Sequence, residues 1–209
     1  IEGFYACGEA ACVSVHGANR LGGNSLLDLV VFGRASGMFI EKQLREGINL
    51  KEASEADIEA AMVGLNRINN SAGGEKASVL RAELQTIMQN YFGVFRRGDF
   101  MKEGIDKLNA LRPRIENVAL EDKSNAFNTA RIEALELQNL FATAEATAIA
   151  AEGRTESRGA HAREDFQERD DENWLCHSVY FPESKTLGKR GVNFTLKTRE
   201  AFEPKIRTY

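Results

Sequence analysis

Cysteine is scarce in this sequence, and it has no long apolar run. The three cysteines, Cys7, Cys12 and Cys176, form no C-x-x-C pair and no other spacing typical of a metal site. We interpret them as reduced thiols of a reducing compartment, with a redox role for Cys7 and Cys12 as the alternative. No stretch approaches the roughly 20 apolar residues of a membrane-spanning helix, and the first residues do not form a signal peptide. These shortages argue against a disulfide scaffold and a cysteine metal site.

Neither sign of charge dominates the chain. Its 27 Lys and Arg residues face 31 Asp and Glu residues, which gives a formal net charge of −4. Because the two signs are interspersed, the pattern is typical of a solvated surface and does not favour nucleic-acid binding. The 209 residues suffice for one large domain or two small ones. The chain begins at Ile1 without an initiator Met, and we expect it to be a piece of a longer protein.

Two familiar nucleotide-binding motifs are also missing. The segment Gly17–Gly22 has the glycine spacing of a P-loop, but Gly23 and Asn24 stand where a lysine and a hydroxyl residue should follow. A nucleoside triphosphate site is therefore not indicated. No G-x-G-x-x-G is present, so the chain alone should not hold the adenosine half of a dinucleotide cofactor.

The most informative stretch is the one that runs from Cys7 to Arg34. The apolar residues at 3–7 predict a short buried strand, which a turn at Gly8 and Glu9 ends. An apolar helix is expected from Ser25, because Ser25 and Asp28 have the spacing of a capping box, with Asn24 as the alternative cap. The helix is almost wholly apolar in its first turns, which predicts that it is buried.

Arg20 lies just before the Gly22–Gly23 pair that leads into this helix. Free N–H groups at a helix amino terminus favour negative charge, and a guanidinium group fits a carboxylate. The sequence therefore predicts an anion site with a buried wall.

The string HGANRLGGNSLLDLVVFGR, which follows a GE pair, resembles a flavin-binding segment of the succinate dehydrogenase and fumarate reductase flavoprotein family. The resemblance continues through RTESRGAHAREDF and DDENWLCHSVY to the final KIRTY, and the ending favours the succinate dehydrogenase branch. It covers the whole chain as the carboxy-terminal third of such a subunit. It implies oxidation of succinate to fumarate by hydride transfer to FAD, with electrons passing through an iron–sulfur subunit to quinone.

The resemblance also implies roles for four residues. Arg20 matches the arginine that binds a substrate carboxylate, and Glu9 matches the glutamate that meets the ribityl chain of FAD. Ser25 and Leu26 match positions whose backbone lies against the isoalloxazine ring. The proton-transferring residue and the histidine that attaches FAD covalently would lie upstream, so the chain alone is expected to be inactive. The chain also contains His16, His161 and His177, for which we assign no chemical role. His16 could touch substrate or flavin, but we interpret all three as structural.

The predicted fold is a multi-part α+β fragment. Residues 1–50 are expected to form the end of an α/β FAD-binding domain, residues 51–152 an antiparallel helical bundle, and residues 153–209 a small C-terminal domain with a short β-hairpin. Apolar stripes predict bundle helices from Ser54, from Ser78, around 101–115 and at about 128–152, with a kink or early end at Pro113. The segment 153–171 reads as irregular and salt-bridged. Strands are expected at 174–181 and 192–196, joined by a turn at 188–191.

The expected partners are an iron–sulfur subunit, membrane anchor subunits bound through it, and a dicarboxylate substrate. The resemblance places such a protein peripherally on the cytoplasmic face of the bacterial inner membrane, or on the matrix side in mitochondria. Two alternatives stay open. One is a fumarate reductase or L-aspartate oxidase of the same superfamily, and the other is a non-catalytic interaction module.

Overall fold

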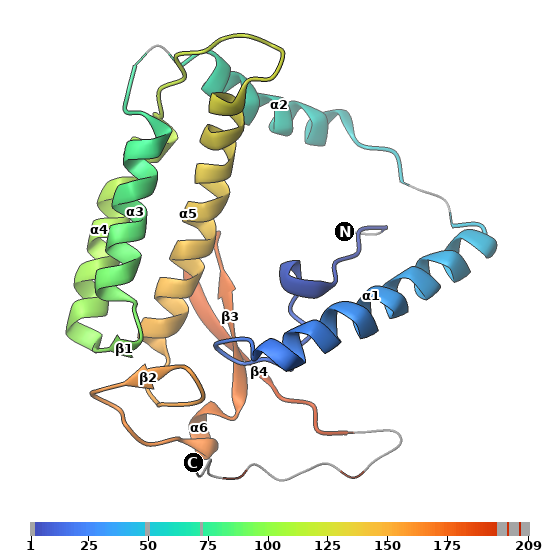
Figure 1. Ribbon diagram of the computed structural model, residues 1–209, viewed down its shortest axis with the longest axis vertical. Coiled ribbons are helices and arrows are strands. Elements are labelled where there is room, and N and C mark those ends of the chain that lie inside the picture. The colour runs from blue at the N-terminus through green and yellow to red at the C-terminus, as the bar shows by residue number, and fades with distance from the viewer. Residues whose placement is uncertain (1–2, 49–50, 72, 196–199, 201–204, 206–209) are drawn as a thin grey trace.

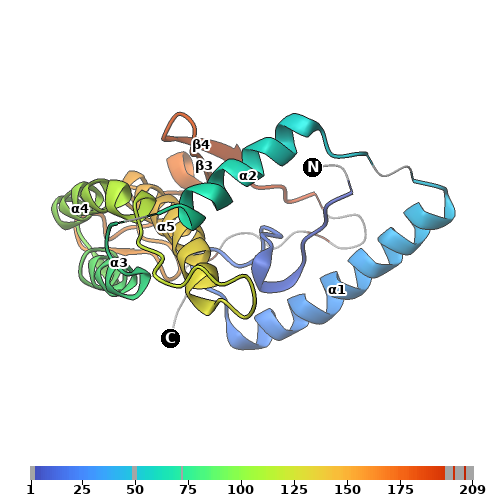
Figure 2. The ribbon, with the colours of Figure 1, turned by 90° about the horizontal axis from the view of Figure 1, so that it is seen from above.

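Helices dominate the computed structural model, which describes residues 3–48, 51–71, 73–195, 200 and 205. Three of them run side by side as a bundle (Figure 1): α3 (Ala77–Tyr91), α4 (Gly98–Glu116) and α5 (Thr129–Gly153). The helix α2 (Glu55–Asn69) meets one end of this bundle, whereas α1 (Gly22–Arg45) lies apart from it in both views (Figures 1 and 2). A turn of 3-10 helix, η1 (Gly8–Ala10), precedes α1.

Two small sheets complete a mixed helical and sheet architecture. The strands β1 (Phe95–Arg96) and β2 (Ala162–Arg163) pair in parallel, with Arg96 opposite Arg163. The strands β3 (Cys176–Phe181) and β4 (Thr186–Gly191) form an antiparallel hairpin, with Cys176 opposite Gly191. A short helix, α6 (Asp171–Trp174), precedes β3.

The core lies between α3, α4 and α5. Their apolar residues recur every three or four positions, so each helix buries one stripe. The most deeply buried members are at most 1% exposed: Leu80, Leu84, Met101, Leu111 and Leu137. Buried alanines line α5, where their small side chains let the neighbouring helices approach closely: Ala134, Ala144, Ala148 and Ala151.

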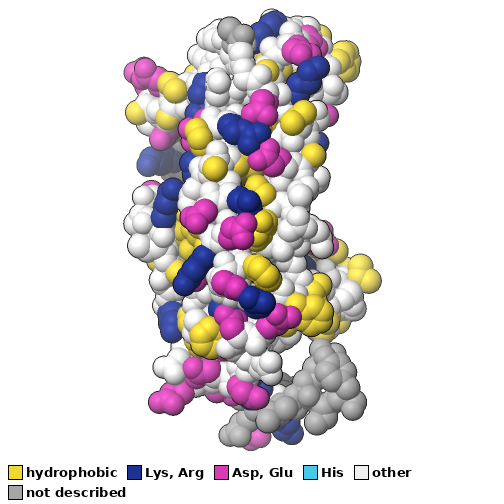
Figure 3. Space-filling model, turned by 90° about the vertical axis from the view of Figure 1, so that its left-hand side faces the viewer, with side chains coloured by type: hydrophobic (Ala, Val, Ile, Leu, Met, Phe, Trp, Pro, Cys, Tyr) yellow, Lys and Arg dark blue, Asp and Glu magenta, His cyan; other side chains and the backbone are white. Residues whose placement is uncertain are grey.

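The outer face of the bundle carries both signs of charge. Figure 3 shows basic and acidic side chains interspersed there with hydrophobic ones. On α4, Arg114 donates to Glu75 and to Glu83 at 2.7–2.8 Å. The mixture is that of a solvated surface, as the composition predicted.

The start of the chain differs from the prediction in three ways. Residues 3–7 form no strand, since the described part of the chain offers them no strand to pair with. The helix begins at Gly22 rather than at Ser25, and Leu21 occupies the cap position. The helix is also not buried, because Leu26 is 67% exposed and Val30 71% exposed. Its apolar residues satisfy the helical pattern, but within the described residues little packs over them.

The turn of the hairpin lies earlier in the chain than predicted. The chain reverses at residues 182–185, and the residues expected to form the turn at 188–191 belong to β4. Pro182 favours a turn, and Lys185 adopts a positive φ of 53°. Gly188 lies within β4, where the absence of a side chain leaves room for Phe181, since a Cβ there would lie 2.9 Å from the Phe181 ring. Trp174 belongs to α6 rather than to the strand, and Leu196 lies outside the described residues.

The predicted helix around 101–115 continues through Pro113 and ends at Glu116. The predicted early end at Pro113 is therefore wrong. Pro113 lies in the last turn of the helix, whose end it does not bring forward. In the part of the chain that the structure describes, no helix combines the length and apolarity needed to cross a membrane. Nor do three or more His, Cys, Asp or Glu side chains gather there as a metal site.

Candidate functional site

The loop 11–21 and the start of α1 bring together Arg20, Ser25 and Asp28. The backbone N–H of Ser25 donates to the carbonyl of Leu21 at 2.7 Å, which is the first hydrogen bond of the helix. The N–H groups of Gly22, Gly23 and Asn24 precede that bond and have no partner within the helix. A Cβ added at Gly22 or Gly23 would meet nothing within 4 Å, so a ligand can approach the backbone there.

Asp28 lies beneath this helix start and is the one buried residue of α1, at 4% exposure. Its Oδ2 lies 2.8 Å from Nε2 of His16 and also accepts a hydrogen bond from Nη2 of Arg20. The hydrogen bond from His16, with the contribution of Arg20, holds the pKa of Asp28 below its usual value despite desolvation. Asp28 is therefore a buried carboxylate anion between two basic side chains.

The guanidinium group of Arg20 is partly engaged within the protein. Its Nε donates to Oγ of Ser25 at 3.0 Å, and its Nη1 lies 3.5 Å from the carbonyl of Gly8. The Ser25 hydroxyl therefore orients Arg20, and the predicted capping box between Ser25 and Asp28 does not form. The Arg20 side chain is still 24% exposed, so part of the cation can meet a ligand.

Glu9 and Leu26, the other two residues that the sequence singled out, are exposed. Glu9 lies in η1 and is exposed. Gly8 before it has a φ of +73°, and a Cβ there would lie 2.6 Å from Cδ2 of Leu29, so glycine is required where η1 meets α1. Arg190 of β4 donates to Oγ of Ser14 at 3.0 Å and so connects the hairpin to the loop. The roles of Glu9, Ser25 and Leu26 toward a cofactor stay predictions.

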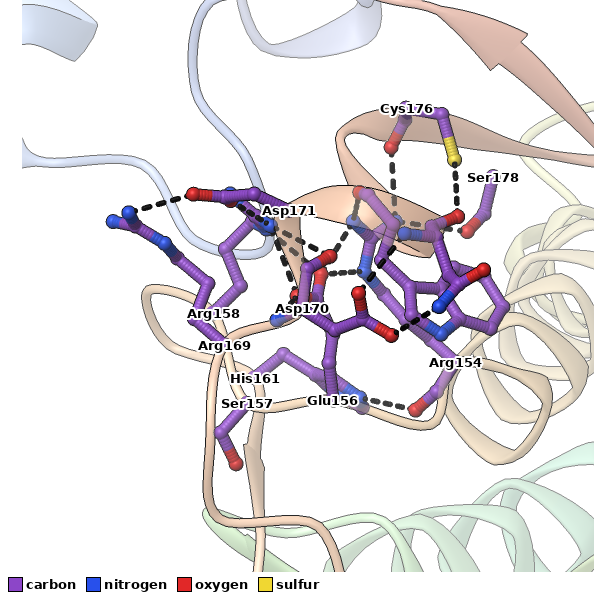
Figure 4. Close-up of polar contacts among 12 residues, drawn as sticks. Arg154, Glu156, Ser157, Arg158, His161, Arg169, Asp170, Asp171, Cys176 and Ser178 are labelled. Atoms are coloured by element: carbon purple, nitrogen blue, oxygen red, sulfur yellow. Dashed lines mark hydrogen bonds and ion pairs between the residues drawn. The ribbon is translucent and has the colours of Figure 1, made fainter. Parts of the chain in front are cut away.

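A second polar cluster follows α5, in the segment predicted to be irregular and salt-bridged. Glu156, which is 0% exposed, lies at its centre (Figure 4). It accepts hydrogen bonds from Arg154, from Arg158 and from the backbone N–H of Asp170 at 2.7–2.9 Å. Burial alone would raise the pKa of Glu156, but these hydrogen bonds together hold it below its usual value.

His161 connects this cluster to the bundle. Its Nδ1 lies 2.8 Å from Nη1 of Arg96, and its Nε2 lies 3.0 Å from the carbonyl of Arg154. Because a guanidinium only donates, Nδ1 accepts and Nε2 carries the proton. Burial, reinforced by the charges of Arg96, Arg163 and Arg154, lowers the pKa of His161. These contacts are structural, and they use both ring nitrogens.

Arg163 and Asp165 complete the connection. The guanidinium of Arg163 donates to three carbonyls at the end of α5, those of residues 151, 152 and 154, at 2.9–3.3 Å. It also pairs with Asp165 at 2.7–2.8 Å. The sequence indicated a salt-bridged segment here, but not that it binds the end of α5.

Grooves elsewhere do not coincide with the Arg20 site. One of about 310 Å³ lies between α3 and α4, and another of about 260 Å³ lies between α4, α5 and the hairpin turn. They are lined by bundle residues such as Tyr91 and Lys107 in the first and Glu145 and Lys185 in the second. Neither groove contains Arg20, Ser25 or Asp28. We therefore locate the candidate site from its charged groups and not from a cavity.

Comparison with known proteins identifies relatives of this chain. Residues 81–209 match the family model "Fumarate reductase flavoprotein C-term", and residues 1–26 match "FAD binding domain". The succinate dehydrogenase flavoprotein subunit of Coxiella burnetii is 50% identical over 207 residues, which cover 99% of this chain and 35% of that protein.

Two solved structures have a similar fold. A quinol–fumarate reductase with menaquinol molecules matches with a TM-score of 0.85 and 38% identity over 93% of this chain and 35% of its own. The Sdh1 complex of Mycobacterium smegmatis in its apo form matches with a TM-score of 0.76 and 34% identity, over 93% of this chain and 33% of its own.

The chain thus spans about a third of the length of the curated relatives that it matches. The FAD-binding match ends within the first turns of α1, next to Arg20 and Ser25, so FAD is the cofactor that it indicates for this region. The carboxy-terminal family model matches more than half of this chain. The chain therefore belongs to the succinate dehydrogenase and fumarate reductase flavoprotein family, as a carboxy-terminal portion.

Proposed function

We propose that this chain is the carboxy-terminal third of the flavoprotein subunit of a succinate dehydrogenase, which oxidises succinate to fumarate. The observation that carries the proposal is the Arg20 guanidinium, which Asp28 and Ser25 hold beside the first N–H groups of α1, which have no partner within the helix. Succinate and fumarate are dianions, so a fixed guanidinium that can pair with a carboxylate favours their binding.

Arg20 would bind one carboxylate of the substrate through the N–H groups that it does not use internally. Orientation matters here because a substrate held in the reactive geometry needs less further ordering to react. The proton-transferring residue is proposed to lie upstream, so residues 1–209 contribute binding and orientation but not the proton transfer itself.

The start of α1 also fits FAD. The backbone is open at Gly22 and Gly23, and the Leu26 side chain is exposed beside them. Bound FAD supplies the hydride acceptor of the reaction. Glu9 would accept hydrogen bonds from ribityl hydroxyl groups, and Ser25 and Leu26 would lie against the ring. Because the N–H of Ser25 is used within the helix, Gly22, Gly23 and Asn24 are the better backbone donors to the cofactor.

The proposal extends to the parts of the chain and to its partners. Residues 1–50 would complete an FAD-binding domain, residues 51–152 would form the helical bundle, and residues 153–209 would form a small C-terminal domain. Similarity to the Sdh1 complex supports assembly with further subunits. We propose an iron–sulfur subunit bound to membrane anchors, on the cytoplasmic face of a bacterial inner membrane or on the matrix side in mitochondria.

A fumarate reductase is the second candidate, because a quinol–fumarate reductase matches this chain with a TM-score of 0.85. Both reactions use the same dicarboxylates, and the Arg20 site suits either direction. The 50% identity to the Coxiella burnetii subunit favours the dehydrogenase.

The test is to assay the complete flavoprotein subunit with its iron–sulfur partner in both directions. We expect reduction of an artificial acceptor by succinate to be faster than oxidation of a reduced dye by fumarate at equal substrate concentration. The reverse order would favour the fumarate reductase. Oxidation of L-aspartate in place of succinate would favour an L-aspartate oxidase, and no redox activity with any of these substrates would leave the interaction module.

A further inference from the structure

We propose that Asp28 is a positioning residue that fixes which edge of the Arg20 guanidinium meets the substrate. The inference rests on the proposed function, in which Arg20 binds a substrate carboxylate. It concerns a residue that would itself touch neither the substrate nor the cofactor.

The burial pattern of α1 is the first observation. Apolar residues of this helix such as Leu26 and Val30 are exposed, whereas the residue that it buries is a carboxylate. Aspartate is rarely this buried unless it is paired. Here Oδ2 receives two basic groups, His16 and Arg20, while the buried Oδ1 has no hydrogen-bond partner among the described residues. Asp28 is therefore placed to meet the two basic groups through Oδ2, although this leaves Oδ1 buried without a hydrogen bond to the described residues.

The second observation is which nitrogens of Arg20 are occupied. Nε donates to Ser25 and Nη2 donates to Asp28, so the side of the guanidinium formed by these two nitrogens is directed into the protein. The remaining N–H groups, on Nη1 and on the outer side of Nη2, form the end-on edge. Among the residues that the structure describes, the one contact of Nη1 is a long one of 3.5 Å, to the carbonyl of Gly8. A carboxylate can bind this end-on edge with two parallel hydrogen bonds.

These contacts imply that Asp28 orients Arg20, whereas Arg20 binds the substrate. A free arginine side chain samples many rotamers, and two contacts on one side of the guanidinium select one of them. Asp28 also neutralises part of the charge of Arg20, so it does not raise the attraction for a dianion. Its benefit is orientation, which should appear in kcat rather than in the affinity for substrate.

The test compares Asp28→Asn and Asp28→Glu in the complete subunit with bound FAD, with Asp106→Asn, at an exposed residue of α4, as the matched control. For Asp28→Asn we expect kcat for succinate to fall about tenfold or more, because misplacement of a reacting group by about an ångström can cost a hundredfold. We expect KM, and the dissociation constant of the unreactive dicarboxylate malonate measured from the flavin spectrum, to stay within about threefold. Asp28→Glu keeps the charge and should recover part of the lost kcat. The control should match the parent.

Other results would overturn the proposal. An Asp28→Asn enzyme with parental kcat would show that Arg20 does not need Asp28. A variant that loses FAD or melts far below the parent, with Asp28→Glu no better, would show that Asp28 holds the fold instead. Arg20→Lys separates the two proposals. If it leaves succinate turnover intact, the substrate role of Arg20 fails, whereas an impaired Arg20→Lys beside a normal Asp28→Asn refutes the positioning role alone.

Discussion

Oδ2 of Asp165 accepts a hydrogen bond from the backbone N–H of Gly98 at 2.9 Å, so a carboxylate far along the chain caps the first residue of α4. Arg163 holds the same carboxylate while it binds the last carbonyls of α5. One ion pair therefore satisfies the ends of two bundle helices, which explains how the segment after α5 is fastened to the bundle.

Asp165→Asn should destabilise the 209-residue chain through this cap. The amide keeps one acceptor but loses the charge that pairs with Arg163, and loss of a helix cap costs about 1 kcal/mol. The measurement is the midpoint of urea unfolding followed by circular dichroism. Glu164→Gln, an exposed neighbour, is the control and should unfold like the parent. Equal midpoints for Asp165→Asn and the control would contradict the capping role.

Glu156→Gln tests the buried cluster in the same way. The substitution removes the carboxylate that Arg154 and Arg158 share, and Glu156 itself is 0% exposed. Removal of one member of a buried ion pair costs about 3 kcal/mol or more. We expect a clearly larger shift of the urea midpoint than for Asp165→Asn. Glu168→Gln, which is exposed, serves as the reference, and a shift no larger than that of the reference would rule out the buried pairing.

His161 should make stability depend on pH. Its pKa in the folded chain lies below the ordinary value of 6.5. As the pH falls through that value, the unfolded chain takes up a proton that the folded chain refuses, so the free energy of unfolding decreases. Stabilisation is complete above about pH 6.5 and is lost progressively below it.

The measurement is the free energy of unfolding between about pH 7.5 and pH 5, where few carboxylates titrate. His161→Gln should flatten this dependence, since the amide can accept from Arg96 and donate to the carbonyl of Arg154 without titrating. A parental slope in His161→Gln would assign the effect to another group.

Gly104 is required by packing. A Cβ on this α4 residue would lie 2.6 Å from Cβ of Tyr91 and 2.6 Å from the ring of Phe92. Gly104→Ala should therefore cost about 1–3 kcal/mol through overpacking. Gly64→Ala in α2 meets nothing within 4 Å and should instead stabilise the chain by up to about 1 kcal/mol. Thermal unfolding of the two variants checks the opposite signs, and a shift in the same direction would contradict the packing account.

The sequence was most informative where an element packs against its own chain. The stripes of α3 and α4 predicted the bundle because residues such as Leu84 and Leu111 belong to one core cluster within this chain. The prediction from the sequence was wrong at residues 3–7 and at the surface of α1. There the apolar pattern predicts burial against other elements, which the described residues do not include. The hairpin was misplaced because glycine was taken as a turn signal, whereas Gly188 makes room for Phe181.

The candidate site was predicted in part for a similar reason. Arg20 beside a helix start could be recognised from the order of residues. That Asp28 turns inward to meet it depends on how the loop 11–21 folds back over α1, and no local pattern encodes that. The signal was present as one acidic residue set in an apolar run, but the spacing from Ser25 favoured a capping box.

The most direct test of the account is the kinetics of Arg20→Lys in the complete FAD-containing subunit. Lysine keeps the charge but lacks the paired N–H groups that bind a carboxylate, so we expect kcat/KM for succinate to fall about 100-fold, or about 2.7 kcal/mol in transition-state free energy. FAD content should stay at the parental level, and Arg45→Lys, at the exposed end of the same helix, should leave the kinetics unchanged. A kcat/KM for Arg20→Lys within about twofold of the parent, with FAD bound, would remove Arg20 from the substrate site and contradict the account.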